Sequence, residues 1–158
     1  MSDGIAIQDA MHIKTCFGCG AENPRGLKIK TYWDGEAGRC TYHPEPHMMA
    51  GPPQFVNGGI VATLMDCHCI STAIAYLYDA ENRTPSSEPG IWCVTGSLHV
   101  DYKRPTPIDR PCALTARIAG VDGRRITVEC TLESEGKMRA EAKVVAVRVK
   151  SEWTGSGT

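Results

Sequence analysis

The segment Gly58–Ala80 constrains the fold of this chain more than any other, because it is long and apolar. Its apolar side chains lie on nearly every face of a helix with about 3.6 residues per turn, so other elements must surround it. The residues are Ile60, Val61, Leu64, Met65, Ile70, Ala73, Ile74 and Leu77. Asp66 and His68 interrupt the run, which makes it a poor membrane span, and we expect no membrane partner.

Alternating apolar residues on both sides of this helix predict the elements that wrap around it. Residues 27–33 and 39–43 flank an Asp34-Gly35 turn and predict a hairpin. Four further strands are predicted at residues 92–102, 112–118, 126–132 and 138–149, with turn signals between them that suit an antiparallel meander. We therefore predict an α+β fold in which an antiparallel sheet of about five or six strands wraps round a long central helix.

The length and charge of the chain are those of one ordinary globular domain. The chain has 158 residues and a formal net charge of −1, whereas a nucleic-acid-binding surface needs concentrated positive charge. We expect an N-terminal arm at 1–15, either loose or a short edge element, a single domain at 16–150, a C-terminal tail at 151–158 and no nucleic-acid partner. Residues 1–15 lack an apolar stretch of signal-peptide length, which predicts a cytoplasmic protein with reduced thiols.

The eight cysteines leave two interpretations open, small buried side chains or a metal or redox site. Cys16 and Cys19 have metal-like C-x-x-C spacing, but no second C-x-x-C pair follows. Cys67 and Cys69 are about 200° apart on a helix and cannot chelate one metal together. We therefore expect packed thiols and no metal.

One motif, at the start of the predicted helix, carries chemistry. Gly58 and Gly59 leave the first backbone amides uncovered, and these donors at the positive end of the helix dipole can receive an oxyanion. Asp66, eight residues after Gly58, interrupts an apolar surface, where an unpaired carboxylate is costly. The motif indicates either a working acid or base, or glycines that permit close packing and a structural carboxylate.

The run from Asn57 to Asp66 resembles the hotdog-fold thioesterases of the phenylacetate-degradation (PaaI-like) type, whose motif is His-Gly-Gly, six residues, then Asp or Glu. The resemblance also covers CFGCGAENPRGL at 16–27, AGPPQF at 50–55 and LHVDYKRPTPI at 98–108. It spans about residues 16–149 and implies a hotdog fold and hydrolysis of an acyl-CoA thioester. Coenzyme A then belongs to the substrate, and no separate cofactor is expected.

The resemblance implies a role for each residue at a matching position. Gly58 and Gly59 would hold the thioester oxygen, and Asp66 would act as general base or as a nucleophile that forms an anhydride. Thr95 stands where some members place a hydroxyl that orients the carboxylate or the water. Asn57 replaces the usual His and would help Thr95 to orient the reacting groups, since it can donate a hydrogen bond but cannot titrate near neutrality.

Four further residues are expected to contact substrate. Cys69, at i+3 from Asp66, would line the acyl pocket, and His68 would contact substrate or remain a structural histidine. Lys103 and Arg104 would meet the phosphates of coenzyme A or simply be solvated.

The spacing along the helix predicts a dimer. Gly58 and Asp66 are eight residues apart, about 12 Å along one helix, too far for both to reach one carbonyl. Two antiparallel helices related by a twofold axis would bring Gly58 of one subunit to Asp66 of the other. We therefore expect a dimer or tetramer. The alternatives are a non-catalytic acyl-CoA-binding protein and a hotdog hydratase or dehydratase, which generally needs a positioned His.

Overall fold

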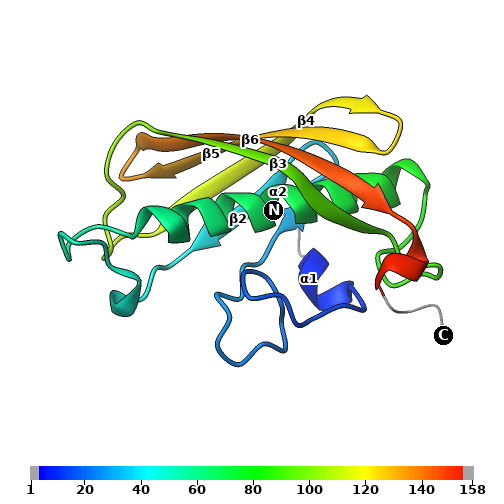
Figure 1. The fold of residues 1–158 in the computed structure, drawn as a ribbon, viewed down its shortest axis with the longest axis horizontal. Coiled ribbons are helices and arrows are strands. Elements are labelled where there is room, and N and C mark those ends of the chain that lie inside the picture. Colours follow the sequence, from blue (N-terminus) through cyan, green and yellow to red (C-terminus); the bar gives the residue numbers. More distant parts are fainter. Residues whose placement is uncertain (1–3, 155–158) are drawn as a thin grey trace.

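A computed structural model describes residues 4–154 and shows a six-stranded antiparallel sheet curved around one long helix (Figure 1). The helices are α1 (Ile7–Ala10) and α2 (Gly58–Ala80), with 3₁₀ turns at Pro46–Met48 and Ser151–Thr154. The strands are β1 (Tyr32–Trp33), β2 (Gly38–Tyr42), β3 (Trp92–Tyr102), β4 (Cys112–Asp122), β5 (Arg125–Ser134) and β6 (Lys137–Val149). The predicted α+β hotdog architecture is confirmed.

The strands lie in the order β1-β2-β4-β5-β6-β3. The predicted meander is correct for β4, β5 and β6, but wrong for β3, which pairs with β6 along its length and forms an edge. The reason is that β2 already pairs with the free side of β4, so β3 must go to the far side of the sheet. The connection from β3 to β4 passes around the N-terminal end of α2 (Figure 1).

Helix α2 fills the concave side of the sheet, as its apolar pattern predicts. Leu64, Met65 and Ala73 are fully buried, and none of residues 60–78 is exposed. On β5 the even-numbered residues from Ile126 to Leu132 are buried against it. The helix is long and apolar enough to cross a bilayer by length and composition, but 56% of its most apolar stretch is buried inside the fold.

The first predicted strand is shorter than expected. Only Tyr32–Trp33 pairs with β2. Lys28 adopts a left-handed backbone conformation with φ 57°, and the Thr31 backbone bonds to Gln8 and Ile7 of the N-terminal segment. Leu27 and Ile29 are nevertheless buried in the core. The alternation of apolar residues therefore predicts the buried residues correctly, but the strand is shorter than it predicts.

Part of the expected N-terminal arm packs against the core, since Ala6, Ile7, Gln8 and Met11 are buried. Gln8 is buried, and its side-chain amide donates to Thr31 Oγ1 at 3.0 Å and to Ser71 Oγ of α2 at 2.9 Å. Its Oε1 accepts from the Thr31 amide at 2.8 Å. These polar partners hold α1 beside α2, and a pattern of apolar residues cannot reveal such contacts.

Candidate functional site

The N-terminal end of α2 presents one free backbone donor. The Asn57 side chain caps the helix, and its Oδ1 accepts from the amides of Gly59 at 2.8 Å and Ile60 at 3.3 Å. The expectation that both glycine amides hold an oxyanion is therefore wrong for Gly59, whose donor is already used. The Gly58 amide, at the first helical position, has no acceptor within residues 4–154.

Basic side chains lie beside this free amide. The Tyr102 hydroxyl donates to the Gly58 carbonyl at 2.6 Å and joins the end of β3 to the start of α2. Gly58, Tyr102, Lys103 and Arg104 all line one cavity of about 270 Å³. Lys103 pairs with Glu141 at 3.5 Å, and both side chains are partly exposed. The structure thus brings the two predicted cationic residues next to Gly58.

Asp66 lies two turns further along α2 and lines a separate cavity of about 230 Å³. Thr95 Oγ1 of β3 donates to Asp66 Oδ1 at 2.8 Å, whereas Oδ2 has no partner among residues 4–154. Burial raises the pKa of the Asp66 carboxyl, partly opposed by the Thr95 hydrogen bond, and the nearby Cys16 raises it further. A half-buried carboxylate with one free oxygen in a cavity can accept a proton from water or attack an electrophile.

A β-bulge explains why Thr95 reaches the helix. The pairing of β3 with β6 shifts between Thr95 and Ser97, and bulges of this kind re-aim side chains. Cys93, two residues earlier, is buried, whereas Leu98 is 40% exposed. The alternating apolar residues Trp92, Val94 and Leu98 therefore do not mark the buried side of this strand. Cys93 is the buried residue of its first half, and the Thr95 hydroxyl reaches Asp66.

His68 does not contact the cavity, which corrects the expectation of a substrate contact. It is fully buried on the other side of α2, where Nε2 lies 3.1 Å from the Gly38 carbonyl and Nδ1 lies 2.8 Å from Thr31 Oγ1. Since a carbonyl can only accept, Nε2 carries the proton and Nδ1 accepts from the hydroxyl. Burial lowers the pKa of His68 to about 4, so the ring is neutral and structural.

Cys69 likewise lies in the core and does not line the Asp66 cavity. It is fully buried against Cys130 of β5. The helical residues that line the cavity with Asp66 are Cys67, Ile70, Ser71 and Ile74. The cavity therefore follows the i+4 and i+8 positions from Asp66, and the i+3 position faces the sheet.

Sequence reasoning missed one cluster, in which Cys67 joins the C-x-x-C pair. The sulfur atoms of Cys16, Cys19 and Cys67 all lie within 4.8 Å of one another, and the Cys16 and Cys67 sulfurs are 3.8 Å apart. All three residues line the Asp66 cavity. All eight cysteines are free thiols.

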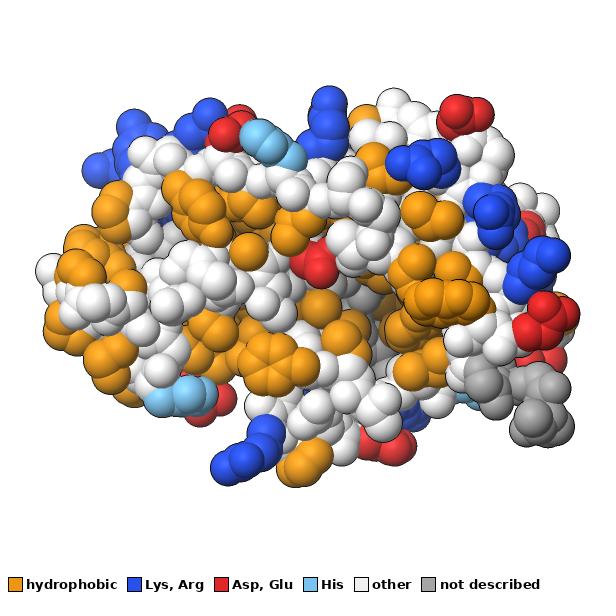
Figure 2. Space-filling model, viewed as in Figure 1, with side chains coloured by type: hydrophobic (Ala, Val, Ile, Leu, Met, Phe, Trp, Pro, Cys, Tyr) orange, Lys and Arg blue, Asp and Glu red, His pale blue; other side chains and the backbone are white. Residues whose placement is uncertain are grey.

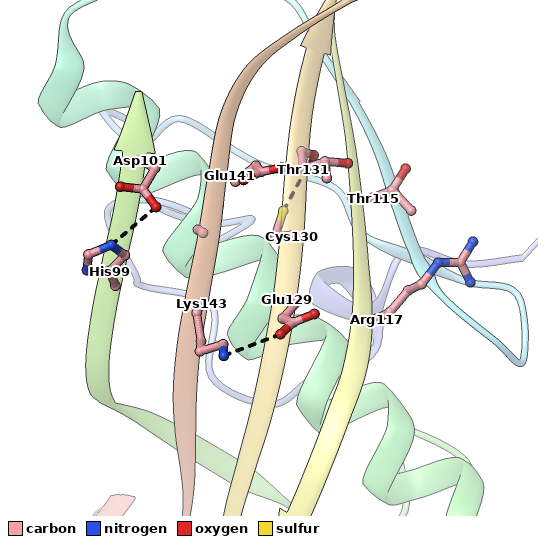
Figure 3. Close-up of a pocket in the computed structure, with 10 residues that line it drawn as sticks. His99, Asp101, Thr115, Arg117, Glu129, Cys130, Thr131, Glu141 and Lys143 are labelled. Atoms are coloured by element: carbon pink, nitrogen blue, oxygen red, sulfur yellow. Dashed lines mark hydrogen bonds and ion pairs between the residues drawn. The ribbon is translucent and has the colours of Figure 1, made fainter. Parts of the chain in front are cut away.

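A larger cavity of about 540 Å³ lies on the face of the sheet that points away from α2 (Figure 3). Two ion pairs lie within its lining, with His99 at 3.3 Å from Asp101 and Lys143 at 3.4 Å from Glu129. None of the predicted site residues lines it. The catalytic hypothesis therefore concerns only the two cavities beside α2.

The comparisons agree with this arrangement. A model of the thioesterase superfamily matches residues 53–141, which include the Gly58 and Asp66 positions. The chain is 26% identical over 111 residues to acyl-coenzyme A thioesterase THEM4 of Xenopus laevis, covering 70% of this chain and 44% of that protein. The chain thus spans less than half the length of this curated relative.

Solved structures share the fold. A thioesterase superfamily protein from Shewanella loihica is 33% identical with a TM-score of 0.60, covering 77% of this chain and 91% of that one. The PaaI protein of E. coli is 17% identical with a TM-score of 0.64, covering 78% and 81%. Protein smu.793 of Streptococcus mutans, bound to acetyl CoA, is 14% identical with a TM-score of 0.63, covering 77% and 88%. The chain belongs to the thioesterase superfamily.

Proposed function

We propose that this protein hydrolyses an acyl-CoA thioester to a free acid and a thiol, at sites shared between two subunits. The observation that carries the proposal is Asp66, a half-buried carboxylate oriented by Thr95 at 2.8 Å with its second oxygen free in a cavity. A protein that only bound acyl-CoA would have no need for a carboxylate in this environment. The acyl-coenzyme A thioesterase THEM4 and the acetyl-CoA-bound smu.793 support this substrate class.

The chemistry needs a base and an oxyanion donor. Asp66 takes a proton from water, and the water oxygen attacks the thioester carbon. The carbonyl oxygen becomes negative and accepts a hydrogen bond from Gly58 of the partner subunit, at the positive end of α2. Collapse of this intermediate breaks the C–S bond, and the thiolate leaves and takes up the proton. Direct attack by the same carboxylate oxygen, through an anhydride, needs the same two groups.

Three features support a shared site. Gly58 and Asp66 are about 12 Å apart along one helix, and they line different cavities of one chain. The strand β3 is a long sheet edge, exposed from Thr95 to His99, and such an edge can pair with a second chain. Figure 2 shows apolar side chains across the middle of one face of the molecule and basic side chains mostly along its rim.

The substrate orientation follows from the charges. Lys103 and Arg104 lie at the Gly58 end of the site, where they can meet the phosphates of coenzyme A. The acyl group then extends towards the Asp66 cavity of the partner subunit, whose walls include Ile70, Ile74 and Trp92. The thioester lies between the two ends, within reach of both the donor and the base.

A hydrolysis screen across acyl chain lengths and aryl groups tests the activity. The loss of thioester absorbance is the appropriate readout, because thiol reagents would also react with the protein's eight free cysteines. We expect turnover of at least one class of acyl-CoA and its loss in Asp66→Asn. Binding without turnover, or turnover that Asp66→Asn does not change, would reject the proposal.

The shared site has a sharper test. Gly58→Pro removes only the amide donor, because proline suits the first helical position and the extended Asn57 (φ −55°, ψ 134°) tolerates a following proline. Gly58→Ala is the matched control, since its added carbon would lie 3.6 Å from its nearest neighbour and the amide remains. Mixed dimers of Gly58→Pro and Asp66→Asn subunits should regain one intact site each. No recovery on mixing would contradict a shared site.

A further inference from the structure

The three thiols beside Asp66 have the spacing of ligands around one metal ion. Zinc binds thiolate sulfur at about 2.3 Å, so two sulfurs of a tetrahedral site lie about 3.8 Å apart. The sulfurs of Cys16 and Cys67 are 3.8 Å apart, and Cys19 completes a triangle with all edges within 4.8 Å. The two sulfurs of a disulfide are about 2.05 Å apart. The Cys16 and Cys67 sulfurs are therefore too far apart for a disulfide, and their separation matches that of two ligands of one metal ion.

The loop that carries Cys16 and Cys19 is held in place by its own backbone. The Gly20 amide donates to the Cys16 carbonyl at 2.8 Å, and the Leu27 amide donates to the Phe17 carbonyl at 2.8 Å. The Ile29 amide donates to the Gly18 carbonyl at 3.2 Å. Because these bonds join the loop to the segment that follows it, Cys16 and Cys19 are positioned before any ion arrives.

Gly18 shows that the loop is fitted to Cys67. A Cβ atom at Gly18 would lie 2.2 Å from the Cys67 sulfur and 3.1 Å from Thr63 Cγ2. Any side chain at this position would therefore displace Cys67 from the other two thiols. The loop and the helix approach as closely as a glycine allows.

We propose that Cys16, Cys19 and Cys67 form a binding site for a thiophilic divalent ion of the zinc class. The ion joins the C-x-x-C loop to α2. Its fourth coordination position opens into the Asp66 cavity, where water can occupy it. Comparing cysteines only with their near neighbours in the sequence could not reveal this site. Its third ligand, Cys67, lies about fifty residues after the loop that carries the other two.

Metal analysis of the 158-residue chain, purified under reducing conditions and then exposed to excess Zn²⁺ and desalted, tests this proposal. We expect one zinc per chain. Cys67→Ser should weaken zinc affinity by more than about 100-fold, since losing even an outer-shell partner costs about 10–100-fold. The matched control is Cys69→Ser, which alters a buried thiol outside the cluster and should retain the zinc.

Cobalt substitution gives a readout that does not depend on activity. Co²⁺ in the wild-type protein should show thiolate charge-transfer absorption and the visible bands of a tetrahedral site. Cys67→Ser should lose these bands, and Gly18→Ala should weaken Co²⁺ binding while leaving all three thiols present. Absence of stoichiometric metal from the reduced wild-type protein, a Cys16–Cys67 disulfide in its place, or full retention of metal by Cys67→Ser would overturn the proposal.

Discussion

Two adjacent pairs of residues on α2 each consist of a titratable side chain followed by a cysteine, but one pair lines a cavity and the other is buried in the core. Asp66 and Cys67 line a cavity, and the carboxylate keeps one oxygen free. His68 and Cys69, the next two residues, are fully buried, and both ring nitrogens of the histidine are hydrogen-bonded. Half a turn of helix therefore separates side chains that line a cavity from side chains that are fully buried.

The difference teaches that angular position on the helix decides the role of a polar residue in this fold. The cavity side faces the C-x-x-C loop and the bulged edge strand β3. The other side faces β2 and the segment around Thr31, which supply acceptors and donors that satisfy His68. Substitutions on the cavity side should accordingly change the rate of hydrolysis, and substitutions on the other side should change the free energy of unfolding.

The largest expected effect is on activity, from Asp66→Asn. Removing a general base costs about 10²–10⁴-fold in rate, so kcat for acyl-CoA hydrolysis should fall by that amount. The free energy of unfolding, measured in urea, should stay near the wild-type value because the substitution is isosteric. An equal loss of stability and activity would place Asp66 among the structural residues and erase the contrast with His68.

His68→Ala should show the opposite behaviour. It removes the acceptor of the Thr31 hydroxyl and a donor to the Gly38 carbonyl and opens a void, so the free energy of unfolding should fall by about 2–4 kcal/mol. The folded fraction should keep its kcat. His99→Ala, at an exposed position of β3, is the control and should change stability by less than about 0.5 kcal/mol. A selective loss of kcat in His68→Ala would instead indicate a catalytic role.

Thr95→Val tests whether the hydroxyl positions Asp66. A hydrogen bond to a charged group is worth about 1.5–3 kcal/mol, which corresponds to about a 10–100-fold loss in kcat with little change in KM. Thr95→Ser keeps the hydroxyl and should restore most of the rate. Equal rates for the valine and serine variants would show that the contact has no part in the reaction.

The smallest expected effect concerns packing on the structural side of α2. A Cβ atom at Gly38 would lie 2.0 Å from Thr72 Oγ1 of α2, so Gly38→Ala should cost about 1–3 kcal/mol of stability. Gly120→Ala, on β4 with nothing within 4 Å of an added carbon, is the matched control and should be nearly neutral. Equal unfolding midpoints for the two variants would show that β2 can shift away from α2 at little cost in stability.

The sequence predicts the local elements well because their signals are local. The bounds of α2 follow from its apolar run, and the turns at Gly123 and Gly136 adopt the left-handed conformation that their Asp-Gly and Glu-Gly sequences indicate. The partner of β3 is not predictable in this way. Its pairing with β6 depends on which sheet edge remains free, which is a property of the whole fold.

In the candidate site, too, some contacts were predictable from the sequence and others depend on the whole fold. The resemblance to the family places Asp66 and Thr95 in the site, and the structure brings them within 2.8 Å. The use of the Gly59 amide by Asn57 depends on a side-chain rotamer, and the meeting of Cys67 with the C-x-x-C loop depends on how the loop folds over the helix. Neither contact leaves a periodic signal in the chain.

The two edges of the sheet have unequal lengths, with two residues in β1 and eleven in β3. When two chains pair through β3, both long edges are consumed, and each outer end of the joined sheet is a β1 strand. Two residues offer too few hydrogen bonds to template another strand. Edge-to-edge growth would then stop after one step, so the proposed dimer would leave no long sheet edge from which a fibre could grow.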